Sequence, residues 1–272
     1  MRHLTAIVAM LVAAPLAAQS IDLPPRPANA PGATAILAEI GELPLKEREA
    51  RIIAEVTRGN VPSWNRRWVP VEVRRRLGSS TVKVIFWVLP DYLAIGSDED
   101  WFLAPLSPQA ATRLGDLIGT SLPTPLMVDA IWKNATARID PDSITPSPAM
   151  VTVPVFIEHQ GMVQARRTAA GITTGTFVAG HKKDVVLTPR LDSLPGRVAI
   201  YGWHRPDSIP IQPLYTGHNN DHVDYSHGIR LVRNIVSLDG MEHELTAVLR
   251  DPMLAQLLSV EGPLREGRYP WQ

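Results

Sequence analysis

Six of the eight histidines in this 272-residue chain lie between residues 159 and 227. Five of them fall in three short segments that are also rich in charged and aromatic residues: AGHKKDVV (179–186), YGWH (201–204) and TGHNNDHVDYSHGIRLV (216–232). Imidazole changes its protonation near neutral pH without a large perturbation, and loops at strand ends commonly carry catalytic or ligand-binding groups. The alternative is a set of unrelated histidines in polar surface loops.

We expect the three segments to meet in one histidine-rich cleft that performs acid–base chemistry. The predicted catalytic residues are His181, Lys182, Asp184, His204, Tyr225, His227 and Arg230. Within this set, His204 and His227 are the preferred acid and base. Arg230 is expected to hold an anionic group of the substrate.

A zinc site is one use that these residues would allow. His218 and His222 have the i, i+4 spacing of two ligands on a helix, but the glycine and asparagines around them disfavour a helix. His181 and Asp184 would share an ion only if His181 precedes the strand, because residues three apart on a strand face opposite sides. With His204 they form the predicted metal set. The order of these residues along the chain is similar to that of the ligands in small peptidoglycan metallopeptidases, in which the interval between the His and the Asp is longer than here.

The segment SHGIRL (226–231) resembles the active-site signature of the L,D-transpeptidases, Ser-His-Gly-Cys-Ile/Val-Arg. The nucleophilic cysteine is missing between Gly228 and Ile229, so no thiolate is present to form an acyl-enzyme. Upstream, VAIYGWH (198–204) is similar to the family's strand that ends in an Ile-His-Gly turn, with Tyr201 in place of that histidine. The resemblance covers about 35 residues and implies a similar β-rich scaffold and an envelope substrate.

Acid–base chemistry without a metal or a covalent step is a further alternative. Tyr225, His227 and Arg230, with the His181–Lys182 pair, resemble the residues of a polysaccharide lyase. In such enzymes a Tyr or His removes the proton beside an acidic sugar's carboxylate, and a cationic side chain neutralises that carboxylate.

The candidates for binding substrate are aromatic. Trp64 and Trp68 flank two arginines and would stack on a sugar or a peptide, and His218 is added to them from the later loop. The alternative role of the tryptophans is to anchor a proline-rich loop to the core.

The first residues predict export. Arg2 and His3 precede an almost wholly apolar run over residues 4–18 that ends in small residues, which is typical of a signal peptide cleaved after Ala18. A run of about 15 residues is short for a membrane span of ~20 residues. No later run is long and apolar enough, so we expect a secreted or periplasmic protein with no transmembrane segment after cleavage.

Composition excludes several classes of function. The chain has 27 Lys and Arg against 27 Asp and Glu, so it has no broad basic field, and we expect no nucleic-acid partner. It has no cysteine, which excludes disulfides, thiolate nucleophiles, iron–sulfur clusters and cysteine-type zinc sites. No phosphate-binding loop, dinucleotide fingerprint or Gly-x-Ser-x-Gly turn occurs, so no cofactor is preferred, and zinc is the one metal considered.

Periodicity and turn residues predict an α+β fold with helices in the N-terminal part, a β-rich C-terminal part, and the site on strand-end loops. We expect helices over 45–58, 107–118, 124–135 and 252–258, and strands over 82–88, 92–95, 151–157, 184–187, 198–203 and 229–236. The first two of these strands should form a hairpin. The predicted organisation is a signal peptide (1–18), a mobile Pro/Ala-rich leader (19–35), a mixed region (36–145) and a β-rich region (146–272), or one domain over 36–272.

Together these features predict an envelope hydrolase that acts on peptidoglycan or a related polymer. The alternatives are a lyase on uronate-containing polysaccharide and a periplasmic binding or scaffold protein that holds a polymer or a small molecule without reaction.

The predicted signal peptide has a direct test. We expect the mature protein to begin at about Gln19, because the apolar run ends in the small residues that signal peptidase recognises. N-terminal sequencing of protein from the native envelope checks this. An intact Met1 in a membrane fraction would contradict it.

Overall fold

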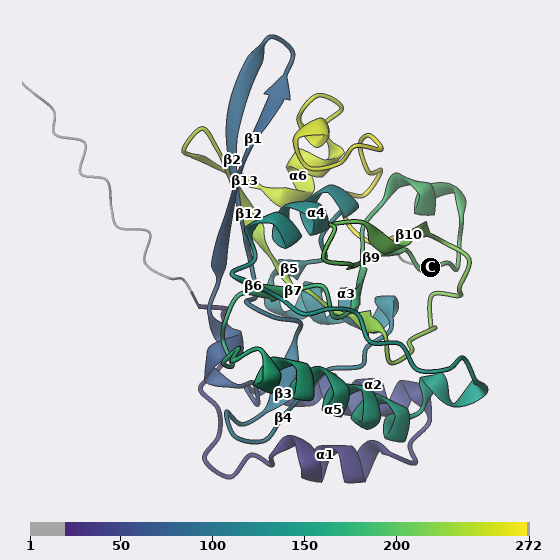
Figure 1. The fold of residues 1–272 in the computed structure, drawn as a ribbon. Helices are drawn as coiled ribbons and strands as arrows, with labels where there is room; N and C mark the ends of the chain where they lie inside the picture. Colours follow the sequence, from purple (N-terminus) through teal and green to yellow (C-terminus); the bar gives the residue numbers. More distant parts are fainter. Residues whose placement is uncertain (1–19, 271–272) are drawn as a thin grey trace, which may run out of the picture.

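A computed structural model describes residues 20–270, and the expected signal peptide over residues 1–18 lies outside them (Figure 1). The helices are α1 (Ala33–Ile40), α2 (Leu45–Thr57), α3 (Pro108–Ile118), α4 (Pro125–Asn134), α5 (Val153–Ala169) and α6 (Leu245–Arg250). Short 3-10 helices are η1 (Ser63–Arg66), η2 (Pro148–Val151), η3 (Pro189–Ser193) and η4 (Leu254–Leu257). The fold is α+β, as expected.

Two sheets organise the strands. The larger contains β1 (Val69–Leu77), β2 (Ser80–Val88), β12 (Val232–Leu238) and β13 (Met241–Glu244) in that order, with β5 (Thr120–Ser121) paired to β12. The smaller has the order β10 (Pro210–Tyr215), β9 (Ile200–His204), β8 (Lys183–Val185) and β11 (His227–Gly228). Two further pairs join β3 (Ala94–Gly96) to β4 (Trp101–Leu103) and β6 (Ala137–Arg138) to β7 (Val178–Ala179).

Three of the expected helices are confirmed, and local signals explain two of their starts. The Ser107 side chain caps α3 by accepting from the backbone N–H of Ala110, and Thr124 caps α4 by accepting from that of Met127. Each helix then begins with proline, whose missing N–H costs nothing in the first turn. The third, α2, begins at Leu45 as expected.

The expected hairpin is wrong. Strand β2 pairs along its whole length with β1, from Val69 opposite Val88 to Leu77 opposite Ser80, and on its other side with β12. The segment after Pro90 contributes β3, which pairs with β4. Pro70 obscured β1 in the sequence, but β1 is an edge strand, where a missing N–H is tolerated. The long β1–β2 hairpin projects beyond the helices in Figure 1.

The strand expected over 151–157 is also wrong, because residue 151 ends η2 and residues 153–157 begin α5. Pro154 lies in the first turn of this helix, which buries Val153, Phe156, His159 and Val163 along one side. The β-branched composition of the first residues suggested a strand, but their spacing, continued beyond residue 157, is helical. Near the C-terminus, η4 lies within the expected helix over 252–258, and α6 precedes it unexpectedly.

The leader is extended but packed onto the fold. Ile21 is buried, and its N–H donates to the Arg66 carbonyl. The Arg26 guanidinium donates to the Asn60 side chain and to the Gly96 carbonyl. The mobility expected for residues 20–32 is therefore wrong, because this stretch has specific partners, and α1 already begins at residue 33.

One hydrophobic core links the two halves of the chain. Strand β12 completes the sheet begun by β1 and β2, and the largest cluster of buried apolar residues extends from Ile21 to Tyr269. The proline-rich stretch over 140–148 therefore does not divide two hydrophobic cores. Among residues 20–270, no helix has both the length and the apolar character needed to cross a bilayer.

Candidate functional site

The smaller sheet brings the three histidine-bearing segments side by side. Across its strands His227 pairs with Lys183, and Lys183 pairs with Gly202. The backbones therefore converge as expected. The side chains of His181, His204 and His227 nevertheless enter three different environments, which are described in turn below.

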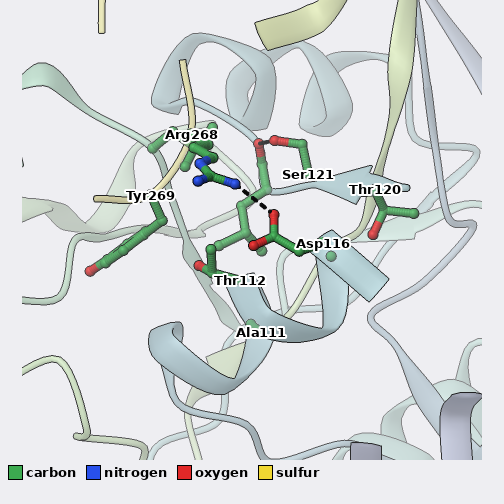
Figure 2. A pocket seen from close by; sticks show the side chains of 10 residues that line it. Ala111, Thr112, Asp116, Thr120, Ser121, Arg268 and Tyr269 are labelled. Atoms are coloured by element: carbon green, nitrogen blue, oxygen red, sulfur yellow. Dashed lines mark hydrogen bonds and ion pairs between the residues drawn. The ribbon is translucent and has the colours of Figure 1, made fainter. Parts of the chain in front are cut away.

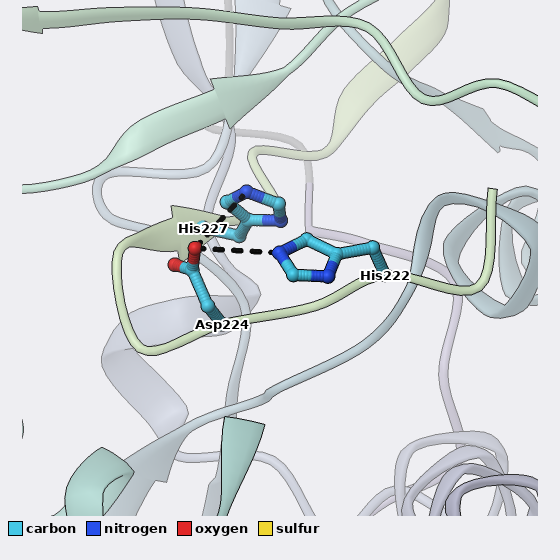
Figure 3. Close-up of side chains that lie close together, drawn as sticks. All are labelled: His222, Asp224 and His227. Carbon is cyan, nitrogen blue, oxygen red and sulfur yellow. Dashed lines mark ion pairs between the residues drawn. The ribbon is translucent and has the colours of Figure 1, made fainter. Parts of the chain in front are cut away.

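The first environment is a cluster of His218, His222, Asp224 and His227, which we call the loop cluster. Figure 3 shows three of its members, His222, Asp224 and His227. Asp224 Oδ2 lies 3.5 Å from His222 Nε2 and 3.8 Å from His227 Nε2. The His218 ring stacks on His222 at 4.1 Å between centroids. The side chain of His227 is fully buried, whereas that of His222 is 29% exposed and connects the cluster to solvent.

The turn DYSHG (224–228) builds this cluster locally. Asp224 Oδ1 accepts from the backbone N–H of Ser226 at 2.7 Å and from its hydroxyl at 2.5 Å, which leaves Oδ2 turned toward the imidazoles. The N–H of Lys183 donates to the Ser226 carbonyl and joins the turn to β8. Gly228 is required next, because a Cβ there would lie 2.5 Å from the Tyr92 ring.

At neutral pH the loop cluster combines a neutral His227 imidazole with an ionised Asp224 carboxylate. Burial lowers the pKa of His227 to about 4, although Asp224 opposes this shift. Burial alone would raise the pKa of Asp224, but its contacts with His222, His227 and Ser226 hold it below its usual range. Burial and the neighbouring His222 lower the pKa of His218.

Lys183 and Trp203 lie beside the loop cluster on the smaller sheet. The Lys183 ammonium is 4.9 Å from the centre of the Trp203 indole, and burial lowers its pKa. Trp203 has φ +56, a left-handed conformation that a bulky residue rarely adopts and that is found most often at functional sites.

His181 occupies the second environment, which is a buried charge network. Its Nε2 lies 3.1 Å from Asp91 Oδ1, and the other oxygen of Asp91 pairs with the Arg167 guanidinium from α5. Burial alone would raise the pKa of Asp91, but Arg167 and His181 hold it below its ordinary value. Burial lowers the pKa of His181 to about 4. These contacts give His181 a structural role.

Arg230 belongs to the same buried region and does not act as an anion holder. It is 1% exposed, and its guanidinium donates to the carbonyls of Leu89 at 3.1 Å and Val178 at 2.8 Å. It also lies 4.3 Å from the centre of the Tyr92 ring. The Tyr92 hydroxyl donates to Asp184 Oδ2 at 2.9 Å, and burial raises the pKa of Asp184 to about 6.

Lys182 and Tyr225 pack against α5. The Lys182 ammonium donates to His159 Nδ1 at 3.1 Å and to the Tyr225 carbonyl, and His159 Nε2 donates to the Asp142 carbonyl at 3.0 Å. The Tyr225 hydroxyl exchanges hydrogen bonds with the backbone of Ile144. Burial lowers the pKa of Lys182 to about 7 and that of His159 to about 2.

His204 occupies the third environment, against α4. Its Nε2 lies 3.0 Å from Asp129 Oδ1, which also accepts from the Tyr201 hydroxyl, and its ring stacks on Trp132. The expected metal set of His181, Asp184 and His204 is therefore not assembled. Among residues 20–270, the one group of three such side chains with ligand atoms within 4.8 Å is His222, Asp224 and His227.

The expected substrate-binding residues are also dispersed. Trp68 is buried in the main core, whereas Trp64 packs edge-on against Trp101 at 4.9 Å. His218 lies in the loop cluster. A small pocket among α3, β5 and the C-terminal segment contains the ion pair of Arg268 and Asp116, at 3.0 Å, and no histidine lines it (Figure 2).

Comparison with known proteins finds no matching family model, no matching curated protein and no matching solved structure. Function is therefore inferred from the site itself. His222 and Asp224 of the loop cluster, and Lys183 beside it, fall outside the set of catalytic residues predicted from sequence. The spacing His-x-Asp-x-x-His over 222–227 was the available signal, because a turn of that length returns both imidazoles to one carboxylate.

The contacts of Arg230 predict a structural role. We expect Arg230→Lys to lower the free energy of unfolding by about 2–4 kcal/mol, because lysine loses the planar donor set and leaves a buried carbonyl unpaired. Denaturant unfolding measures this, with the exposed Arg205→Lys as the control. Unchanged stability together with lost turnover would restore the anion-holding role.

The buried neutral imidazole of His159 predicts acid sensitivity. Its pKa is about 2 in the folded protein against an ordinary value of 6.5, so its contribution to stability is present above pH 6.5 and is lost as the pH falls. The expected slope is about 1.4 kcal/mol per pH unit.

Between about pH 6 and about pH 4, the unfolding free energy of the parent protein should fall more steeply than that of His159→Gln. The difference in slope should be about 1.4 kcal/mol per pH unit. His243→Gln, on the partly exposed strand β13, should leave the slope as it is in the parent protein. Equal slopes in all three proteins would show that His159 is protonated without cost in the folded state.

Proposed function

We propose that this protein is a secreted or periplasmic hydrolase of the cell envelope that acts on peptidoglycan or a related polymer through the loop cluster. The observation that carries the proposal is the position of the Asp224 carboxylate, 3.5 Å from His222 Nε2 and 3.8 Å from His227 Nε2, in a cluster that solvent reaches at His222. A carboxylate and imidazoles gathered at one point that solvent reaches are able to position an attacking water and to take up its proton.

Lys183 supplies the second requirement of hydrolysis, which is stabilisation of negative charge. It lies next to His227 across the β8–β11 pairing, and the Trp203 indole fixes its ammonium. A half-buried cation at this position would stabilise the oxyanion that forms when water adds to a substrate carbonyl. The envelope location is supported by the predicted signal peptide, and the polymer substrate by the resemblance of SHGIRL to the transpeptidase signature.

The contacts do not favour the lyase alternative. A lyase would need Tyr225 and Arg230 to face an acidic sugar together. The Tyr225 hydroxyl is bonded to the backbone of Ile144, and the Arg230 donors are bonded to buried carbonyls. The two cations predicted for a lyase, Arg230 and Lys182, are both buried, so neither lies at the surface to neutralise a uronate.

Incubation with purified sacculi and with acidic polysaccharides tests the proposal. We expect products that have gained water, and Asp224→Asn should lower the rate by about 10²–10⁴-fold, since it keeps the shape of the side chain and removes the charge. The matched control is Asp116→Asn, which removes an exposed carboxylate from the pocket of Figure 2 and should retain the parent rate.

The other outcomes contradict the proposal in distinct ways. Unsaturated products that absorb in the near ultraviolet would identify a lyase. Binding of the polymer without any change in its mass would identify a binding protein.

A further inference from the structure

The distances between the Asp224 carboxylate and the imidazoles of the loop cluster are too long for hydrogen bonds. Asp224 Oδ2 is 3.5 Å from His222 Nε2 and 3.8 Å from His227 Nε2. A charge-assisted N–H···O bond would be about 2.7–2.9 Å long. The carboxylate thus faces both nitrogens but is too far from each for a direct hydrogen bond.

The same spacing suits three ligands of one ion. With zinc–ligand bonds of about 2.0–2.2 Å, a tetrahedral site puts neighbouring ligand atoms about 3.3–3.6 Å apart. The two measured separations, 3.5 and 3.8 Å, lie at or just above this range, and the three ligand atoms are all within 4.8 Å of one another.

The imidazole nitrogens also lack other partners. Both ring nitrogens of the fully buried His227 side chain are without a hydrogen bond, and so is the buried Nε2 of His222. A buried polar group without a partner costs about 1–3 kcal/mol, so several at one point call for a group that satisfies them together. A cation that accepts a lone pair from one nitrogen of each ring satisfies Nε2 of His222 and Nε2 of His227 together.

Asp224 is held for this role by its own turn. Ser226 donates to Oδ1 through both its backbone N–H and its hydroxyl, so the carboxylate cannot rotate freely and Oδ2 stays turned toward the imidazoles. An outer partner that orients a ligating carboxylate is a regular feature of metal sites. Ser226 is itself fully buried, so its hydroxyl is not exposed for nucleophilic attack.

We infer that His222, Asp224 and His227 form a binding site for one Zn²⁺ ion. Two imidazoles and a carboxylate are ligands that zinc prefers, and three protein ligands leave a fourth position for water, as in catalytic rather than structural sites. Lys183 and Lys182 are nearby cations that oppose metal binding, but the Lys183 ammonium lies over the Trp203 ring, and that of Lys182 donates to His159 and to the Tyr225 carbonyl. The use of the ion to activate water rests on the proposed hydrolase function, whereas its binding does not.

Metal binding is measured on the purified protein after treatment with a chelator. We expect calorimetric titration with Zn²⁺ to saturate at one ion per chain, and Co²⁺ to give the intense visible bands of a tetrahedral site. His222→Gln and Asp224→Asn should weaken zinc binding by more than ~100-fold, and Ser226→Ala, which removes the outer contact, by ~10–100-fold.

Two histidine variants serve as controls. His204→Gln removes a buried histidine held by Asp129, and His243→Gln removes one from β13, and both should bind zinc with the parent affinity. Failure of the parent protein to bind zinc, or parent-like affinity in His222→Gln and Asp224→Asn, would overturn the inference. Circular dichroism shows whether each variant is folded.

The activity assay separates this inference from the proposed function. Stoichiometric zinc without cleavage of any polymer would leave the metal site standing and refute the hydrolase. Cleavage at an undiminished rate by protein that binds no zinc would refute the metal site and leave the hydrolase standing.

Discussion

The buried carboxylate of Asp91 is the constraint on which the rest of the structure depends. A charge removed from water is tolerated only when it is paired, and loss of one partner of a buried pair costs about 3–5 kcal/mol. Asp91 follows β2 and pairs with Arg167 from α5 and with His181, which lies two residues before β8 of the smaller sheet. Its pairing therefore sets the position of the larger sheet, a helix and the smaller sheet relative to one another.

The next residue along the chain extends this network to the site. Tyr92 donates to Asp184, lies under the Arg230 guanidinium and fills the space that a Cβ at Gly228 would need. The parallel pairing of β8 with β11 thus rests on a packed aromatic ring. On the smaller sheet, Asp184 points into this buried network while Lys183 lies beside the loop cluster, because successive strand side chains face opposite sides. The same strand supplies structure on one face and chemistry on the other.

Local signals were sufficient for much of the fold. Pro108 at the first helical position indicated α3, the apolar side formed by Met127, Ile131 and Trp132 indicated α4, and the α+β class followed from the change in periodicity along the chain. The errors arose where local composition and tertiary context disagree. The first residues of α5 are β-branched, and only the burial of His159 and Val163 further along shows the helical face. Strand β1 contains a proline that its position at a sheet edge makes harmless.

For the site, the sequence by itself determined which side chains are able to exchange protons and that their segments lie at strand ends. It also determined the turn that sets Ser226 against Asp224, because those residues are two apart. Only the tertiary structure decided which histidines are occupied by other partners. Arg167 reaches Asp91 across 76 positions of the chain, and no local pattern encodes a contact of that separation. His181 is paired with Asp91, whereas both ring nitrogens of His227 lack a hydrogen-bond partner. The two side chains differ because burial and distant charges, not residue type, determine what an imidazole is able to do.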